Sequence, residues 1–274
     1  MALSHWRAFM IKLNGDICLF KYYNDGSTRA SINIDKCRTN HIITWLYDNT
    51  NEEILELYYL VNHLHEHGIT HITLNLPYIV NARQDRVKSN SEVFTLKYFA
   101  NLINSLNFDK VRVFDPHSYV STALINHVEV EMPIEEITIM LNKYPEAVLC
   151  FTDEGGYKRY HSYFKAPFIF GIKERDWETQ EIKSLQIAGA KHMIAGHDII
   201  ICDDIVSRGS TLYLTAKTLK EMGANKIYVW VSRCENTILG SILLDYSDLI
   251  EKIYTTNSIY RANHPKIEVI KEFK

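Results

Sequence analysis

The sequence predicts an α/β protein made of two similar lobes, each with a mainly parallel sheet flanked by helices. Short apolar runs alternate with amphipathic stretches along the chain, which is the pattern of successive β–α units. The alternation stops over residues 129–146, which contain Pro133 and Pro145, and then starts again. We therefore expect one lobe in residues 1–145 and a second lobe in residues 146–274.

The first lobe begins with short β segments, and "NDG" at 24–26 predicts a hairpin turn between two of them. A helix follows, with Thr50 and Glu53 as a capping box at its start and Gly68 at its end. Its apolar stripe consists of Ile54, Leu57, Leu60, Val61 and Leu64. The remaining expected elements of this lobe are a strand at 69–77, a helix at about 91–107 and a strand at 110–114.

The second lobe repeats the same kind of unit. A helix is expected from about 210 to 222, closed by Gly223. The alternating residues 266–274 are typical of an edge strand. The other expected strands are 147–151, 167–172, 198–202 and 226–231.

Composition excludes several classes of function. The net charge of −3 provides no basic field for nucleic acid, so any binding of anions must be local. No run of residues is apolar and long enough for a signal peptide or a membrane span. The chain has five cysteines and no C-x-x-C pair, which favours a reduced, cytoplasmic protein with inert buried thiols.

Polar clusters follow four of the predicted strands, at 75–86, 114–118, 151–159 and 201–211. In open parallel α/β sheets, ligands bind at the carboxyl ends of the strands. We therefore expect these four clusters to converge on one edge and to form the functional site. The pair His63 and His67, one helical turn apart, is instead interpreted as the basic end of a helix, because no third metal ligand accompanies it.

The stretch "ICDDIVSRGSTL" at 201–212 carries the most chemistry. Small residues before a helix let backbone N–H groups and the helix N-terminus bind a phosphate. The carboxylates of Asp203 and Asp204 would repel that phosphate, so they suit sugar hydroxyls or a magnesium-associated group instead. A ribose phosphate satisfies both requirements. The alternative is an ordinary helix N-terminus with two solvated acids, and the residues of this stretch alone leave that alternative open.

The same stretch resembles the ribose-5-phosphate loop of type I phosphoribosyltransferases and of ribose-phosphate pyrophosphokinases. A second segment, "LPYIVNARQDRVKS" at 76–89, resembles the ATP-binding segment of the pyrophosphokinases, which simple phosphoribosyltransferases lack. The guanidinium of Arg83 can fork onto phosphate oxygens, and Gln84 can bond a base or a phosphate. The resemblance implies two type I phosphoribosyltransferase-like lobes and an ATP site that includes Arg83, Gln84 and Asp85.

Further segments resemble the same family in the same order. "FDPHS" at 114–118 is similar to the segment whose histidine touches magnesium–ATP, which implies that His117 binds ATP and the metal. "FTDEGG" at 151–156 is similar to an acid-plus-glycine loop and implies that Asp153 is a magnesium ligand. "GIKERD" at 171–176 resembles the flexible catalytic segment.

The catalytic segment implies that Lys173 and Arg175 are the catalytic cations. "YYNDGS" at 22–27 resembles the turn that contacts adenine from a neighbouring subunit, which implies ATP contacts by Tyr23 and Asp25 and a homo-oligomer.

Members of this family transfer a diphosphate from ATP to the anomeric hydroxyl of ribose 5-phosphate and release AMP. The resemblance therefore implies ATP as co-substrate, Mg²⁺ as cofactor, and small-molecule partners without nucleic acid or membrane. Asp203 and Asp204 are expected to hold the ribose hydroxyls. The phosphate is expected to lie in a cradle formed by Ser207, Arg208, Gly209, Ser210 and Thr211.

The chain departs from the family in places that touch substrate. The family's turn reads approximately D-T-G-G-T, whereas this chain has an arginine, Arg208, and no acid in the turn. The extra cation suits more phosphate than a monoester carries, so the acceptor is either ribose 5-phosphate or ADP-ribose. ADP-ribose is the acceptor expected for phage-type ADP-ribose pyrophosphate synthetases, which act in rebuilding NAD.

Two other departures concern the first lobe. Ser27 stands where the family carries a glutamate, and residues 1–22 replace a shortened first β–α unit. Other possible functions are a type I phosphoribosyltransferase and a non-catalytic regulatory relative.

Overall fold

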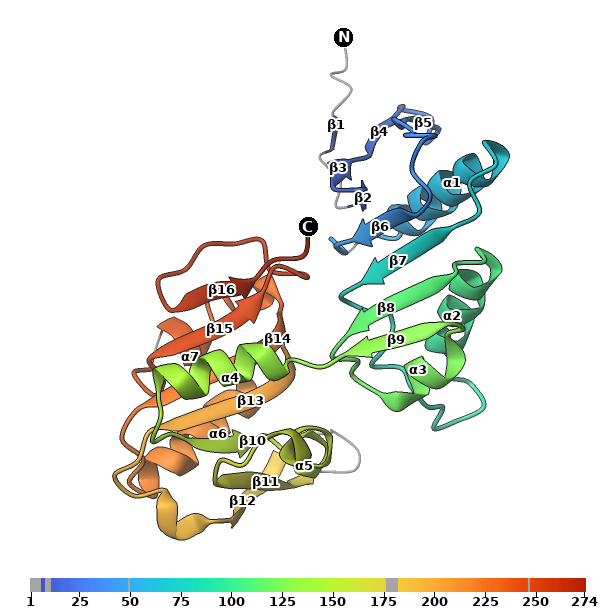
Figure 1. Ribbon diagram of the computed structural model, residues 1–274. Coiled ribbons are helices and arrows are strands. Elements are labelled where there is room, and N and C mark those ends of the chain that lie inside the picture. Colours follow the sequence, from blue (N-terminus) through green and yellow to red (C-terminus); the bar gives the residue numbers. More distant parts are fainter. Residues whose placement is uncertain (1–5, 8–10, 49, 176–181, 246) are drawn as a thin grey trace. The chain divides into compact units, whose positions relative to one another are not determined.

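The computed structural model describes residues 6–7, 11–48, 50–175, 182–245 and 247–274. Its chain forms two compact units, and each is described by itself (Figure 1). The first unit comprises Met1–Met132 together with Phe273–Lys274, and the second comprises Pro133–Glu272. Both are α/β units with mainly parallel sheets and helices, so the predicted fold class is confirmed.

The first unit contains a six-stranded sheet in the order β3-β2-β6-β7-β8-β9. Strands β6 to β9 are parallel to one another, and the short strands β2 and β3 continue the sheet in antiparallel fashion. The strands are β2 (Ile11–Leu13), β3 (Asp16–Ile17), β6 (His41–Trp45), β7 (Ile72–Leu76), β8 (Lys110–Phe114) and β9 (Val128–Glu131). The parallel strands carry the clusters expected to bind ATP at their carboxyl ends.

A separate antiparallel sheet, ordered β1-β4-β5, holds the predicted hairpin. Its strands are β1 (Trp6–Arg7), β4 (Leu19–Tyr22) and β5 (Thr28–Ser31). The turn between β4 and β5 is closed by the Tyr23 N–H, which donates to the Ser27 carbonyl over 2.9 Å. Gly26 in this turn has φ +83°, a left-handed conformation that a side chain would disfavour. The hairpin predicted from "NDG" is confirmed.

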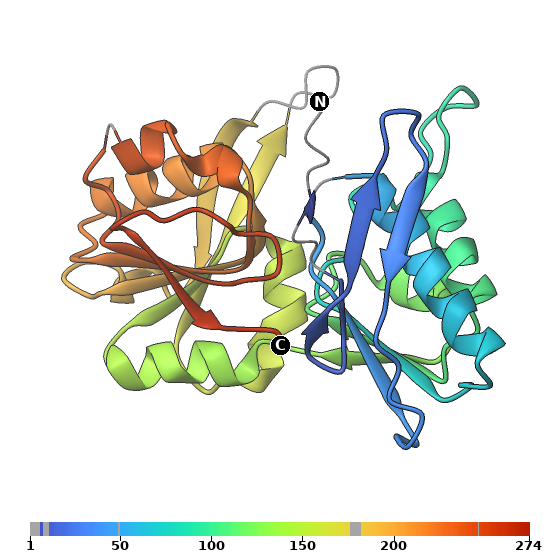
Figure 2. The ribbon, with the colours of Figure 1, turned by 90° about the horizontal axis from the view of Figure 1, so that it is seen from above.

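The helices of the first unit are α1 (Glu52–Glu66), α2 (Thr95–Ser105) and α3 (Tyr119–Leu124). The predicted stripe of α1 supplies Leu57, Leu60, Val61 and Leu64, all fully buried, to one core that also contains α2 residues and one side of the sheet (Figure 2). Burial of apolar surface of this kind is the main favourable term in folding. Helix α2 begins later than predicted, because residues 91–94 form turns.

The capping box at the start of α1 forms only in part. The Glu53 carboxylate accepts hydrogen bonds from the backbone and hydroxyl of Thr50, as predicted, but the N-cap position itself is Asn51. Glu53 also accepts bonds from the Trp45 indole at 2.7 Å and from the Asp48 N–H at 2.9 Å. The carboxylate is completely buried, and burial raises its pKa. Glu53 therefore ties the loop after β6 to the helix.

The second unit contains a seven-stranded sheet in the order β12-β11-β10-β13-β14-β15-β16. All neighbours are parallel except β12, which pairs antiparallel with β11. The strands are β10 (Val148–Phe151), β11 (Phe168–Arg175), β12 (Ile182–Gly189), β13 (Ile199–Val206), β14 (Ile227–Cys234), β15 (Lys252–Thr256) and β16 (Ile267–Lys271). Because β16 lies at the end of this order, the predicted edge strand is confirmed.

The helices of the second unit are α4 (Ile134–Lys143), α5 (Glu154–Tyr160), α6 (Ser210–Glu221) and the short α7 (Ile242–Asp245). Helix α6 matches the predicted helix closely, and Gly223 follows it with φ +89°. None of the helices in the described ranges has the length and apolar character needed to cross a membrane.

The division between the units lies at Met132–Pro133, earlier than the boundary expected after residue 145. Helix α4 belongs to the second unit because its far end packs there. The Tyr144 ring stacks on Tyr228 with 3.7 Å between centroids, and its hydroxyl bonds that of Tyr254 over 2.7 Å. Near the start of α4, Glu136 pairs with Lys271 at 2.7 Å.

Three strands of the second unit are longer than predicted. Strand β11 continues through Arg175, because its pairing with β12 persists to that residue. Strand β13 continues through Val206 and β14 through Cys234, because their pairing persists at Asp203–Val231 and Ile205–Arg233. The acids of the "CDDIV" stretch therefore lie within the strand rather than after it.

Candidate active site

The acceptor cluster of the second unit lies where three parallel strands, β10, β13 and β14, end side by side. The loop after β10 leads into α5, and the turn after β13 leads into α6. Carboxyl ends of parallel strands share one edge of a sheet, so these loops are neighbours. The clusters at 151–159 and 201–211 therefore lie together in this unit. The clusters at 75–86 and 114–118 follow strands of the other sheet, so the four clusters do not share one sheet edge as expected.

Asp203 is held by the end of β10. The hydroxyl of Thr152 donates to Asp203 Oδ2 over 2.8 Å, and Thr152 is 1% exposed. Asp203 Oδ1 accepts the backbone N–H of Asp204 at 3.0 Å. Both oxygens are thus oriented before any ligand arrives, which lowers the cost of ordering this side chain on binding.

Asp204 is paired with two arginines that sequence reasoning missed. Arg233 Nη2 lies 3.1 Å from Asp204 Oδ2, and Arg159 Nη1 lies 3.7 Å from Oδ1. The Asp204 side chain is 7% exposed and that of Arg233 is 3% exposed. A signal was available, since Arg233 is a charge near the end of the otherwise apolar run "IYVWV". The oxygens of Asp204, which are expected to bind ribose hydroxyls, therefore also contact these two arginines.

The turn at 207–211 has the backbone expected of a phosphate cradle. Gly209 has φ +75°, and a Cβ there would approach Leu243 Cδ2 to 3.2 Å, so glycine is required twice over. No side chain of the described residues caps the N-terminus of α6. The N–H groups of its first turn, at Ser210 and Thr211, can therefore bind an anion, helped by the helix dipole.

The side chains of this turn differ in their surroundings. The hydroxyls of Ser207 and Thr237 lie 3.1 Å apart. The Arg208 side chain is exposed, and within the described ranges it forms no ion pair. The alternatives to a role with ligand are that Arg208 pairs with a nearby acid, which is not seen there, or that it points to solvent, which its exposure fits.

Asp153 occupies the end of β10 in a fixed orientation. It is the N-cap of α5, where its Oδ1 accepts the Gly156 N–H at 2.9 Å. A side chain at Gly155 would crowd the same oxygen at 3.2 Å, which explains the glycine there.

The side chains that could serve as metal ligands determine how magnesium could be held. The described residues contain no group of three or more His, Cys, Asp or Glu side chains that could enclose a metal ion by themselves. Magnesium that accompanies a nucleotide needs only one or two carboxylates, because phosphates and water supply the other ligands. One well-oriented carboxylate, Asp153, fits that mode.

In the first unit, the predicted ATP segment is a loop anchored by apolar side chains. Three apolar residues of the loop, Ile79, Val80 and Ala82, are buried. Of the residues that follow, Arg83 is exposed, and Gln84 and Asp85 are half-buried. The Gln84 N–H donates to the Asn81 carbonyl at 2.9 Å, and Asn81 has φ +64°. The loop thus presents its polar residues at the carboxyl end of β7.

His117 follows the neighbouring strand β8 and is half-buried. The next residue, Ser118, caps α3 by accepting the Val120 N–H at 3.2 Å. Asp115, two residues earlier, is fully buried with φ +43°, and its N–H donates to the Glu131 carbonyl. His117 and the ATP loop therefore extend from adjacent strands of one sheet.

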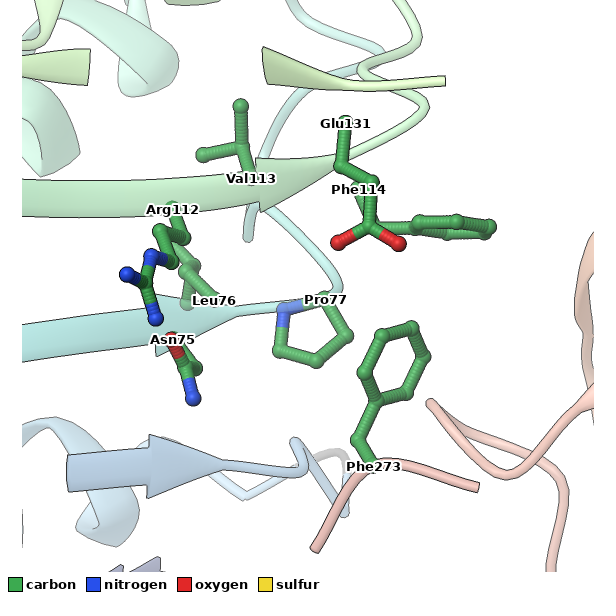
Figure 3. A pocket seen from close by; sticks show the side chains of 8 residues that line it. All are labelled: Asn75, Leu76, Pro77, Arg112, Val113, Phe114, Glu131 and Phe273. Atoms are coloured by element: carbon green, nitrogen blue, oxygen red, sulfur yellow. The ribbon is translucent and has the colours of Figure 1, made fainter. Parts of the chain in front are cut away.

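A pocket of about 130 Å³ lies beside the start of the ATP loop (Figure 3). Phe273, from the end of the chain, faces Phe114 and Pro77 to form its apolar wall, and Asn75 and Arg112 lie together on another side. The rings of Phe114 and Phe273 are edge to face with 5.2 Å between centroids. Sequence reasoning missed this pocket because Phe273 is distant along the chain.

The hairpin turn expected to contact adenine is also well defined. Tyr23 is 43% exposed at its start. Asp25 Oδ1 accepts bonds from the N–H and hydroxyl of Ser27 at 2.9 and 2.6 Å, and these bonds lower the pKa of Asp25. The preceding Tyr22 hydroxyl bonds Glu56 of α1, which fixes the hairpin to the unit. Ser27, the departure from the family, therefore has a structural task within the turn.

The backbone of Lys173 and Arg175 lies in β11, and their side chains lie outside the described part of the structure. Residues 176–181, which complete the catalytic segment, also lie outside it.

Comparison with known proteins supports the family resemblance. A model of the N-terminal domain of ribose phosphate pyrophosphokinase matches residues 11–106, and a model of the phosphoribosyl transferase domain matches residues 154–237. Together these matches span more than half of the chain.

Individual relatives agree with the domain matches. The chain is 28% identical to the ribose-phosphate pyrophosphokinase of Bacillus subtilis in an alignment of 270 residues that covers 93% of this chain and 81% of that protein. It is 27% identical to the enzyme of the same name from Sulfurisphaera tokodaii, over 87% of this chain and 83% of that protein.

A solved structure has the same fold. The phosphoribosylpyrophosphate synthetase of Mycobacterium smegmatis superposes with a TM-score of 0.75 at 16% identity, covering 98% of this chain and 86% of that chain. The chain belongs to the ribose-phosphate pyrophosphokinase family.

Proposed function

We propose that the protein transfers a diphosphate group from ATP to the anomeric hydroxyl of a ribose 5-phosphate moiety, with release of AMP. The observation that carries the proposal is the acceptor turn, where an uncapped helix N-terminus after Gly209 follows two oriented acids, Asp203 and Asp204. The same chain carries the ATP loop at 82–86, which a phosphoribosyltransferase does not need.

In the proposed reaction, the anomeric oxygen attacks the β-phosphorus of ATP. The bond from the β-phosphorus to the oxygen bridging it to the α-phosphorus breaks, AMP leaves with that oxygen, and the hydroxyl proton is released. Positioning and charge stabilisation account for most catalysis of phosphoryl transfer. Lys173 and Arg175 are proposed to supply positive charge to the transferring group.

The acceptor is proposed to bind through its phosphate and its ribose hydroxyls. The N–H groups of residues 207–211 receive the phosphate, with the Arg208 guanidinium beside them. Asp203 accepts hydrogen bonds from the ribose hydroxyls, and Asp204 assists while bonded to Arg233.

ATP is proposed to bind through the loop of Arg83, Gln84 and Asp85 together with His117, and through Tyr23 and Asp25 of the hairpin turn. If that turn serves the ATP of a neighbouring copy, as the resemblance implies, the working form is a homo-oligomer. Size-exclusion chromatography with light scattering tests this part, and a monomer that is fully active would exclude it. We also propose a cytoplasmic location, which suits the free cysteines of the chain.

Asp153 is proposed to hold magnesium together with phosphate oxygens of the nucleotide. His117 is proposed, from the family resemblance alone, to contact the magnesium–nucleotide as well. When bound, the ion neutralises charge on the phosphates.

The acceptor itself is proposed to be ADP-ribose, with ribose 5-phosphate as the ordinary alternative. ADP-ribose has a free anomeric hydroxyl and a second phosphate. Arg208 offers an exposed cation next to the proposed site of the first phosphate.

The test is incubation with Mg²⁺ and ATP plus each acceptor, followed by mass measurement of the products. A mass gain of one diphosphate on ADP-ribose, with stoichiometric AMP, supports the full proposal. A gain on ribose 5-phosphate alone rejects ADP-ribose and keeps the reaction. Absence of AMP with both acceptors rejects the reaction, and consumption of an activated sugar with a base would instead indicate a phosphoribosyltransferase.

A further inference from the structure

The end of β14 forms one wall of the acceptor turn. Three contacts, made by every second residue of the segment 233–237, join this segment to the end of β13 and to the first residue of the turn. Arg233 pairs with Asp204 at 3.1 Å, the Glu235 N–H donates to the Val206 carbonyl at 2.9 Å, and Thr237 meets Ser207 at 3.1 Å. The segment 233–237 therefore runs alongside the chain from Asp204 in β13 to Ser207, the first residue of the proposed phosphate cradle.

Arg233 is the most deeply buried charge in this wall. Its side chain is 3% exposed and that of its partner Asp204 is 7% exposed. Removing one partner of such a pair leaves the other charge buried without compensation, which is strongly unfavourable. The carboxylate of Asp204 therefore depends on Arg233 both for its charge and for its orientation.

Arg159 adds a second cation on the other oxygen of Asp204. Arg159 lies near the C-terminal end of α5, and 14% of its side chain is exposed. Its guanidinium also lies over the Tyr160 ring. Three elements, α5, β13 and β14, thus meet at one carboxylate. Planar guanidinium groups fix carboxylate geometry better than an ammonium group does.

We propose that Arg233 is a positioning residue for the acceptor, acting through Asp204. This inference rests on the proposed function and extends it to a residue outside the predicted loop. Arg233 fixes the orientation of the Asp204 carboxylate beside Asp203, so its effect is expected on the acceptor rather than on ATP.

The experiment compares steady-state kinetics of four variants, R233M, R233K, D204N and R233M/D204N, with K252M as a matched control. Lys252 forms a surface pair with Glu268 between neighbouring strands of the same sheet, at 2.6 Å. Each variant is titrated with the acceptor that the wild type uses and, separately, with ATP. Thermal unfolding of each variant is followed in parallel.

We expect R233M to raise the KM for the acceptor by about tenfold or more and to change the KM for ATP by less than about twofold. R233K should recover part of the loss. In the D204N background the R233M change should add less than about twofold, because it acts through the same carboxylate. K252M should behave as wild type.

Equal changes in both KM values, or a full R233M effect in the D204N background, would overturn the positioning role while leaving the proposed reaction intact. A lower melting temperature with unchanged acceptor KM would assign Arg233 to stability alone. Wild-type protein that releases no AMP with either acceptor would reject the proposed reaction and this inference together.

Discussion

Thr152 donates its hydroxyl hydrogen to Asp203 across the neighbouring strands β10 and β13, over 2.8 Å. Thr152 immediately precedes Asp153, so the proposed sugar-binding carboxylate of Asp203 is bonded to the residue next to the proposed magnesium ligand. This contact couples the two halves of the acceptor site through a hydroxyl group that is 1% exposed.

Replacing Thr152 by valine tests that coupling. The substitution keeps the shape and removes the donor, so Asp203 loses a buried hydrogen bond worth about 1 kcal/mol. We expect the KM for the acceptor to rise by about fivefold, with little change for ATP. Steady-state kinetics measures both.

The control for this prediction is T138V, which makes the same change on α4, where the exposed Thr138 hydroxyl bonds only the Ile134 carbonyl among the contacts described. T138V should keep wild-type kinetics. An unchanged acceptor KM in T152V would show that Asp203 needs no help from β10.

Glycine at the start of α6 provides a second test. G209A forces a side chain into the left-handed region at φ +75° and against Leu243, whereas G196A, at φ +78°, has no neighbour within 4 Å. Both should lose about 1 kcal/mol of unfolding free energy from the backbone. G209A should lose more and should also weaken acceptor binding. Equal losses from the two variants in chemical denaturation would contradict the crowding seen at Leu243.

Arg208 should separate the two candidate acceptors. R208M is expected to lower kcat/KM for ADP-ribose by about tenfold or more and that for ribose 5-phosphate by less, because only ADP-ribose brings a second phosphate. The matched control is K217M, an exposed cation further along α6. Equal losses for both acceptors would assign Arg208 to the shared phosphate.

Lys173 and Arg175, the proposed catalytic cations, should affect turnover more than binding. K173A and R175A are each expected to lower kcat for AMP release by about a hundredfold, the effect of removing one charge-stabilising group from a transition state. K191A, which changes an exposed lysine of the same unit, serves as the control. Loss of ATP affinity with unchanged kcat would contradict the catalytic role.

The cysteines should differ sharply in reactivity. Burial raises the pKa of Cys18 and of Cys234 to about 12, whereas Cys37 is exposed. A raised pKa keeps a thiol protonated at neutral pH, and the thiolate is the reactive form. Iodoacetamide at pH 8 should therefore label Cys37 first and the two buried thiols only after unfolding. Peptide mass mapping would contradict this if Cys18 were labelled as fast as Cys37.

The strands and helices were predictable wherever the spacing of apolar residues agreed with the positions of turn and capping residues. The stripe of α1 from Leu57 to Leu64, the hairpin at Gly26 and the edge strand β16 follow from local sequence alone, since each depends on neighbours within a few residues. The turn at 207–211 before α6 was predictable for the same reason, whereas the position of Asp203 and Asp204 inside β13 was not.

What sequence could not supply depends on pairing between distant segments. Strand β13 continues beyond residue 202 because β14 offers partners there, and the partner of Asp204 is Arg233, which lies on that other strand. Helix α4 joins the second unit through ring stacking of Tyr144 on Tyr228, which no local pattern encodes.

The last two residues of the sequence return to the first unit. Phe273 packs on Phe114, and the Lys274 carbonyl accepts the Thr44 hydroxyl at 2.8 Å. The connection between the units is therefore double, entering at Pro133 and coming back after Glu272. A purification tag fused at this end would lie next to the contact of Phe273 with Phe114 and could perturb the first unit, and residues 1–132 expressed separately would lack the Phe273 ring.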